Sequence, residues 1–167
     1  MISIVKSAVG ILVFALCVLS SSASADMWHR ADLKNVVQLS DIGIIGRPVS
    51  SETKMVDQRV TTETTFAVSE TLFGRDQATV TVVTPGGIYM GGPVPFAVDM
   101  GSVLPLHTDG DSVLLLTETD SSLYELASFG EGFFPIRGEG NDAEVVVEGS
   151  TSPVSVTRFI ETIRNYR

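Results

Sequence analysis

The chain has 167 residues, with 20 acidic against 11 basic side chains and a formal net charge of −9, so it lacks the cationic surface that nucleic-acid-binding proteins turn toward phosphates. Its single cysteine, Cys17, excludes a fold stapled by disulfides within the chain and a zinc site with several cysteine ligands. The length is sufficient for one domain with a hydrophobic core.

The N-terminus has the three parts of a secretory signal peptide. Lys6 supplies the positive start, Ala8–Leu19 is an apolar run with one interruption, and Ala23-Ser24-Ala25 is a small-x-small cleavage site. The apolar run is shorter than the roughly 20 residues that span a bilayer. We therefore expect residues 1–25 to be a signal peptide and Asp26 to begin an exported protein, periplasmic or extracellular, with no stable membrane insertion. An uncleaved membrane anchor is the alternative.

Cys17 belongs to the apolar run, and Leu16 stands before it where a lipid-attachment motif needs a small residue. The mature domain is therefore expected to be free of cysteine and to depend on its hydrophobic core. Its acidic residues are scattered along the chain, which is typical of a solvated surface.

Apolar periodicity predicts a short N-terminal helix, several strands and a C-terminal helix. Ala31–Ser40 has Leu33, Val36 and Val37 at helical spacing, with an extended segment as the alternative, and from Ile42 onward the period changes to two. The strands predicted over Arg59–Phe73 and Ala78–Thr84 are separated by a turn and should form a long antiparallel hairpin. The predicted strands are Ile42–Ser50, Arg59–Phe73, Ala78–Thr84, the doubly buried Val113–Thr117, and the shorter Leu123–Ser128, Phe133–Arg137 and Ala143–Glu148.

Glycine and proline separate these strands. Pro85–Pro95, rich in both residues, predicts a loop with or without irregular edge pairing, and Pro93–Val98 is typical of an edge strand. Asp109-Gly110 is a tight-turn signal. At the C-terminus, Ser152 is the predicted N-cap and Pro153 the first residue of a helix. Its apolar stripe, which should pack on the β core, consists of Val156, Phe159, Ile160 and Ile163.

These elements predict a mainly β fold: a small antiparallel OB-like barrel or sandwich with a short N-terminal helix and a C-terminal amphipathic helix. We expect a single domain over residues 26–167, with the barrel at about 40–149 and the helix at about 153–166.

The order of the segments resembles a group of bacterial exported proteins of unknown function. The resembling segments are Ser40–Gly46, Thr61–Gly74, Val80–Gly87, Gly110–Leu116 and Phe129–Phe134. The resemblance implies an OB-type barrel, related in shape to the netrin module and to tissue inhibitors of metalloproteinases. Those inhibitors bind the protease zinc through an N-terminal cysteine, whereas the mature chain here begins at Asp26, so no functional residue is carried over.

We predict no catalytic residue, no metal site and no cofactor. The mature histidines, His29 and His107, do not form a pair at ligand spacing, and a catalytic triad would have to use one of them. His107, Asp109 and Asp111 form a hypothetical cation site, which we interpret as a polar turn. The acidic pairs Glu118/Asp120 and Glu131/Glu139 have the residue types of glycosidase sites, but such pairs are inevitable among 20 acidic residues.

Binding is the better-supported hypothesis. The loop Thr84–Gly92 has no basic residue to hold a phosphate, and its glycines suit sharp bends. Tyr89 and Met90 within it are candidate recognition residues, unless both fold back on the barrel as a lid, and Asp109-Gly110 is a second candidate contact. Trp28 either packs on the barrel or anchors a partner.

Three functions follow as hypotheses. The first is a non-enzymatic exported binding module that contacts or inhibits an exported protease through its loops. The alternatives are a hydrolase with a site near His107 and a structural envelope protein without a discrete ligand.

Overall fold

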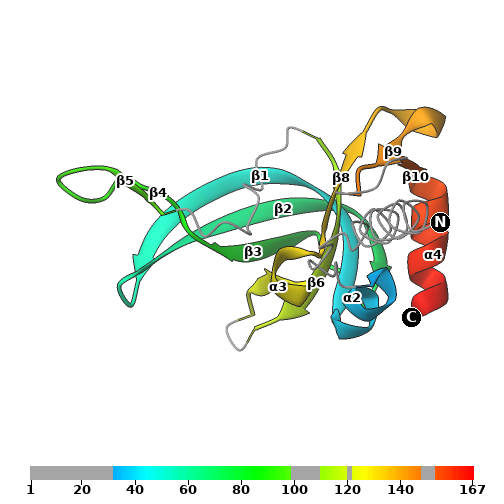
Figure 1. Ribbon diagram of the computed structural model, residues 1–167, viewed down its shortest axis with the longest axis horizontal. Helices are drawn as coiled ribbons and strands as arrows, with labels where there is room; N and C mark the ends of the chain where they lie inside the picture. The colour runs from blue at the N-terminus through cyan, green and yellow to red at the C-terminus, as the bar shows by residue number, and fades with distance from the viewer. Residues whose placement is uncertain (1–31, 99–109, 120–121, 148–152) are drawn as a thin grey trace, which may run out of the picture. The chain divides into compact units, whose positions relative to one another are not determined.

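A computed structural model describes residues 32–98, 110–119, 122–147 and 153–167 (Figure 1). The predicted signal peptide, Trp28, His29, His107, Asp109, Asp120 and Ser152 lie outside these ranges. The helices are α2 (Leu33–Leu39), α3 (Ala127–Gly130) and α4 (Val156–Tyr166). The strands are β1 (Ile42–Val56), β2 (Arg59–Phe73), β3 (Thr79–Pro85), β4 (Gly87–Tyr89), β5 (Phe96–Val98), β6 (Ser112–Glu118), β7 (Tyr124–Leu126), β8 (Phe133–Arg137), β9 (Glu144–Val145) and β10 (Val154–Ser155). None of the helices in these ranges is both long and apolar enough to cross a membrane.

Five strands pair in a ring, in the order β1-β2-β3-β7-β6 and back to β1. Every pairing is antiparallel except that of β3 with β7, which is parallel and consists of the pair Val82 and Tyr124. β8, β9 and β10 extend the sheet from β6. The predicted mainly β, barrel-like fold with a helix near each end is confirmed, although the ring closes unevenly because its β3–β7 seam is so short.

β6 separates two apolar cores. Leu114 and Leu116 point into the ring, and Val113 and Leu115 point to the opposite face, where α2 and α4 pack; all four are fully buried. This arrangement confirms the strand that was predicted to be buried on both faces. Burying one such side chain stabilises the fold by about 1.5–3 kcal/mol, so β6 is a major contributor to stability.

The apolar stripe of α4 packs on the sheet as predicted. Phe159, Ile160 and Ile163 are buried, and the ring of Phe159 lies 5.0 Å from that of Phe134 in β8. The predicted start of this helix at residue 153 is wrong. Val154 and Ser155 pair with β9 instead, and the Ser155 hydroxyl, as N-cap, accepts a hydrogen bond from the Arg158 amide.

Three strands differ from the prediction by more than one residue at an end, and β3 and β6 differ by one residue at each end. β1 continues past Ser50 to Val56, because cross-strand hydroxyl pairs replace the apolar alternation that ended the predicted strand. The strand predicted over Leu123–Ser128 ends at Leu126, where α3 begins. The strand predicted over Ala143–Glu148 is reduced, within the described residues, to β9.

Candidate functional site

The segment predicted as a loop, Pro85–Pro95, contains a strand. β4 pairs antiparallel with β5, and the two form a small hairpin of their own beside the ends of β1 and β2 (Figure 1). The prolines do not interrupt the pairing, since Pro85 ends β3 and the other two lie in the bend between β4 and β5. The predicted loop is therefore a β-hairpin with a proline-rich bend, and β5 lies within the segment Pro93–Val98 that was predicted to be edge-like.

Two glycines fix this hairpin to the sheet. The Gly86 amide donates to the Val60 carbonyl at 2.8 Å, and the Gly86 carbonyl accepts from the Thr62 hydroxyl at 2.8 Å. Gly87 has a φ of +124°, and a Cβ on it would lie 2.3 Å from Thr62 Oγ1 and 2.9 Å from Thr53 Oγ1. Only glycine permits both this backbone conformation and this approach. The base of the β4–β5 hairpin therefore has a defined position on β1 and β2.

The face beneath the hairpin is lined with hydroxyl groups. Thr53 and Thr62 share a hydrogen bond of 2.9 Å, and Ser51 and Thr64 share one of 3.2 Å. Thr64 is buried, and in the part of the chain that the structure describes no buried side-chain nitrogen or oxygen lacks a partner. Because satisfied polar networks rigidify the structure around them, this face is a firm support for the hairpin.

Exposed apolar side chains gather around the same hairpin. Eight large hydrophobic residues are exposed in the described ranges, and six of them lie on β4, β5, the bend between them or the adjoining end of β1. Val56 alternates with Met55 and points to the opposite face of β1, so we call the other five the hairpin patch: Met55, Ile88, Met90, Val94 and Phe96. Met90 and Val94 are the most exposed, at 68% and 70%. Clustered exposed hydrophobic residues mark interaction surfaces, whereas single ones are ordinary.

Tyr89 and Met90, the two candidate recognition residues, differ in their environment. Met90 is exposed, but Tyr89 is half-buried and its ring packs on Phe96 with the centroids 5.6 Å apart. Tyr89 therefore supports the hairpin from within, and Met90 presents its side chain to solvent. The binding role of both remains a prediction. Sequence reasoning did not single out Ile88, Val94 or Phe96; the available signal was the recurrence of apolar residues in a segment otherwise made of glycine and proline.

A groove of about 580 Å³ lies between β1 and the hairpin, lined by residues 51–55 and 88–91. Lys54 on its rim pairs with Glu63 at 2.8 Å and Glu52 at 3.2 Å. Hydrogen bonds to Glu63 and then to Glu52 raise the pKa of Lys54 above its ordinary value of 10.5. A lysine whose pKa is raised on folding stabilises the folded state at every pH below its ordinary pKa, and this contribution is lost only as the pH rises through the folded-state pKa. The ion pairs of Lys54 with Glu63 and Glu52 therefore persist at neutral pH.

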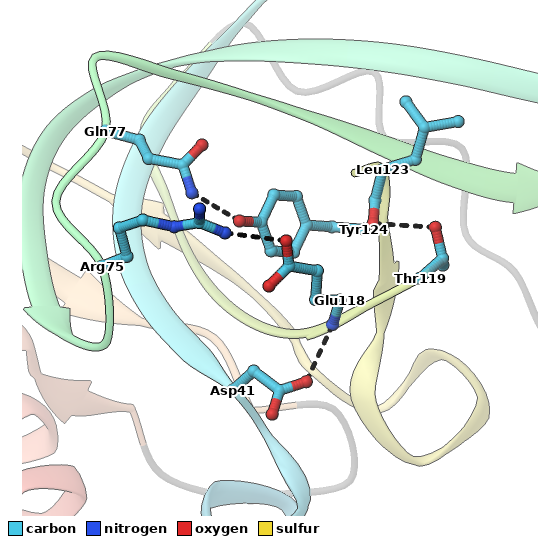
Figure 2. Close-up of polar contacts among 7 residues, drawn as sticks. All are labelled: Asp41, Arg75, Gln77, Glu118, Thr119, Leu123 and Tyr124. Carbon is cyan, nitrogen blue, oxygen red and sulfur yellow. Dashed lines mark hydrogen bonds and ion pairs between the residues drawn. The ribbon is translucent and has the colours of Figure 1, made fainter. Parts of the chain in front are cut away.

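A second polar cluster has a structural role. Figure 2 shows Arg75 and Gln77, from the turn between β2 and β3, reaching Glu118 at the end of β6 and Tyr124 in β7. Arg75 pairs with Glu118 at 2.7 Å, and the Gln77 amide donates to the Tyr124 hydroxyl. These contacts connect the turn before β3 with β6 and β7, and so they hold the ring together at the short β3–β7 pairing, which we call the seam. We call the contacts of Arg75 and Gln77 with Glu118 and Tyr124 the clasp. The hydrogen bond and charge of Glu118 raise the pKa of Arg75, and Tyr124 adds to the shift.

The other candidate residues are dispersed. Gly110 precedes β6 near the Ile136 carbonyl, and Asp111 pairs with Arg47 at 3.1 Å. Glu118 is held by Arg75, and Glu131 and Glu139 lie in the turns on either side of β8. Within the described residues, no three histidine, cysteine, aspartate or glutamate side chains are grouped to hold a metal ion. The structure thus places Tyr89 and Met90 on the β4–β5 hairpin, whereas Gly110 lies beside β8.

Compared with known proteins, the chain matches no protein family, no curated protein and no solved structure, so its function has to be inferred from its own residues.

Proposed function

We propose that this chain is an exported, non-enzymatic binding module that holds a partner protein at the hairpin patch. The observation that carries the proposal is the concentration of five exposed apolar side chains on one hairpin and the strand end beside it. Covering such a surface releases about 25 cal/mol per Å² of apolar area, which favours a partner that excludes water from it.

The support beneath the patch favours binding further. The hairpin is fixed by Gly86, Gly87 and the hydroxyls of Thr53 and Thr62, so less freedom is lost when a partner docks. Met90 supplies a flexible, polarizable side chain that adapts to irregular surfaces. The resemblance to exported barrel proteins makes an exported protease the first partner to test, as a contact or as an inhibited target.

The test compares charged substitutions inside and outside the patch. Protein recovered after export is immobilised as wild type, Ile88→Asp, Met90→Asp and, as a matched control, Leu39→Asp. Leu39 is 62% exposed and lies on α2, outside the patch. The ligand is the secreted protease fraction of the producing cells, and both retained protease and residual proteolytic activity are measured.

We expect the wild type and Leu39→Asp to retain protease and both patch variants to retain about ten-fold less, a change of about 1.4 kcal/mol in binding free energy. All four proteins should unfold within about 0.5 kcal/mol of one another, because the substituted side chains are exposed. Equal retention by all four would exclude the patch as the binding surface, and retention by none would exclude a protease as the partner.

A further inference from the structure

Among the described residues, one edge of β1 has no strand neighbour beside the groove. β1 pairs with β2 along nearly its whole length but with β6 only over Ile42–Gly46. From residue 47 to 56, its other edge has no strand partner among the described residues. Edges of this kind are templates for pairing with another chain.

The backbone groups along that edge follow from the hairpin register. Val56 and Arg59 flank a two-residue turn, so Val56 and every second residue before it bond to β2. Ser51, Thr53 and Met55 therefore direct their N–H and C=O groups toward the unoccupied edge. Pro48 and the register shift between Pro48 and Ser50 interrupt the edge on one side, which leaves a short stretch, residues 51–56, for pairing.

The two faces of this stretch differ in chemistry. Thr53 and Met55 lie on the hairpin side, where Ile88 and Met90 line the same groove. The side chains of Glu52 and Lys54 alternate with these, so they extend toward the opposite face of β1 and border the groove at its rim. Lys54 is shared between two glutamates and Glu52 is 71% exposed, so the charge around Glu52 is negative, whereas Arg59 lies on the same face closer to the turn.

We propose that an extended segment of the partner adds to β1 as a further strand in this groove, with apolar side chains toward the hairpin and basic side chains toward Glu52. The inference rests on the proposed function and specifies its partner. Main-chain hydrogen bonds to residues 51–55 supply affinity, and the alternation of apolar and basic residues supplies selectivity. The negative charge of the chain favours the same basic segment.

A synthetic peptide tests this mode directly. The probe is acetyl-(Val-Lys)₄-Val-amide, and binding is measured by calorimetry. Its controls are the same peptide with glutamate in place of lysine and the same peptide with alternate amides N-methylated. We expect saturable binding of the lysine peptide, about ten-fold weaker binding of the glutamate peptide, and loss of binding on methylation of the edge-facing amides. The Glu52→Lys variant should reverse the preference between lysine and glutamate.

Variants of β1 provide the complementary test. Thr53→Pro removes the edge N–H, and Thr53→Val removes only the hydroxyl that pairs with Thr62. Peptide binding should be lost in the first and kept in the second. If Thr53→Pro fails to fold, the methylated peptide answers the same question on the wild-type protein.

Strand addition would be overturned if no peptide bound saturably, or if the methylated and unmethylated peptides bound equally well. It would also be overturned by slow hydrogen exchange of the Thr53 and Met55 amides in the free monomer, because the chain would then cover its own edge. Slow amide exchange that appears only with dimerisation at higher concentration would assign the edge to a second copy of the chain and would also overturn strand addition.

The outcomes separate the two proposals. If the peptides do not bind while the Ile88→Asp and Met90→Asp variants still lose the protease, strand addition is wrong and the proposed function stands. If the patch variants keep the protease, the proposed function itself is wrong.

Discussion

Gly87 and Thr62 approach each other so closely that a Cβ on the glycine would lie 2.3 Å from the threonine hydroxyl oxygen. The hydroxyl is not free to move away, since it donates to the Gly86 carbonyl and shares a hydrogen bond with Thr53. This approach joins the β4–β5 hairpin to the polar face of β1 and β2. The position of the hairpin patch therefore depends on one residue that has no side chain.

Replacing Gly87 with alanine should displace the hairpin. The substitution adds a clash with Thr62 and forces a non-glycine residue to a φ of +124°, so we expect it to lower the free energy of unfolding by about 2–3 kcal/mol. Chemical denaturation measures this loss. Gly92→Ala is the matched control in the same segment, because a Cβ there has nothing nearer than 3.7 Å, and it should change stability by less than about 0.5 kcal/mol. Equal effects of the two substitutions would contradict the anchoring role of Gly87.

The turn of the β1–β2 hairpin should be open to stabilisation. Asp57 and Gln58 both have positive φ, of 49° and 64°, which is the pattern of a type I′ turn that favours glycine at its second position. Gln58→Gly relieves about 1–2 kcal/mol of left-handed strain against about 0.4–1 kcal/mol of added entropy in the unfolded chain, so we expect a net gain of about 0.5–1 kcal/mol.

Thermal unfolding measures the gain from Gln58→Gly. Gln58→Ala serves as its control, because alanine removes the same side chain without relieving the backbone. It should show no gain in stability. A Gln58→Gly protein that unfolds below the wild type would show that the turn carries no such strain.

The clasp across the β3–β7 seam contains two interactions of different strength. Tyr124 is buried, so Tyr124→Phe leaves the half-buried Gln77 amide without this acceptor and should cost about 1–1.5 kcal/mol of unfolding free energy, independent of salt. The side chains of Arg75 and Glu118 are 66% and 40% exposed. Glu118→Gln should therefore cost at most about 1 kcal/mol, and less in high salt.

Denaturation at low and at high salt separates these two contributions. The expected order is a larger and salt-independent loss for Tyr124→Phe and a smaller, screened loss for Glu118→Gln. The reverse order would mean that the ion pair, rather than the buried hydrogen bond, holds the seam.

The sequence predicted best those elements whose burial follows a local period. β2 has the predicted bounds, β6 is buried on both faces as its apolar run indicated, and Phe159, Ile160 and Ile163 form the predicted stripe of α4. Exposed Met90 was also within reach of the sequence, because an apolar residue among glycines and prolines has few neighbours to pack against. In each case the signal is contained in a few consecutive residues.

What the sequence determined was thus the class of fold and the faces that its strands and helices bury. Only the tertiary structure decided that Tyr89 packs on Phe96 and that Val82 meets Tyr124 to close the ring. It also decided that, within the described ranges, the end of β1 has one edge without a strand partner beside the patch. The first kind of information is local, because side-chain direction along a strand or helix repeats with a fixed period. The second kind depends on which distant segments become neighbours, and that choice is made by the packing of the whole chain.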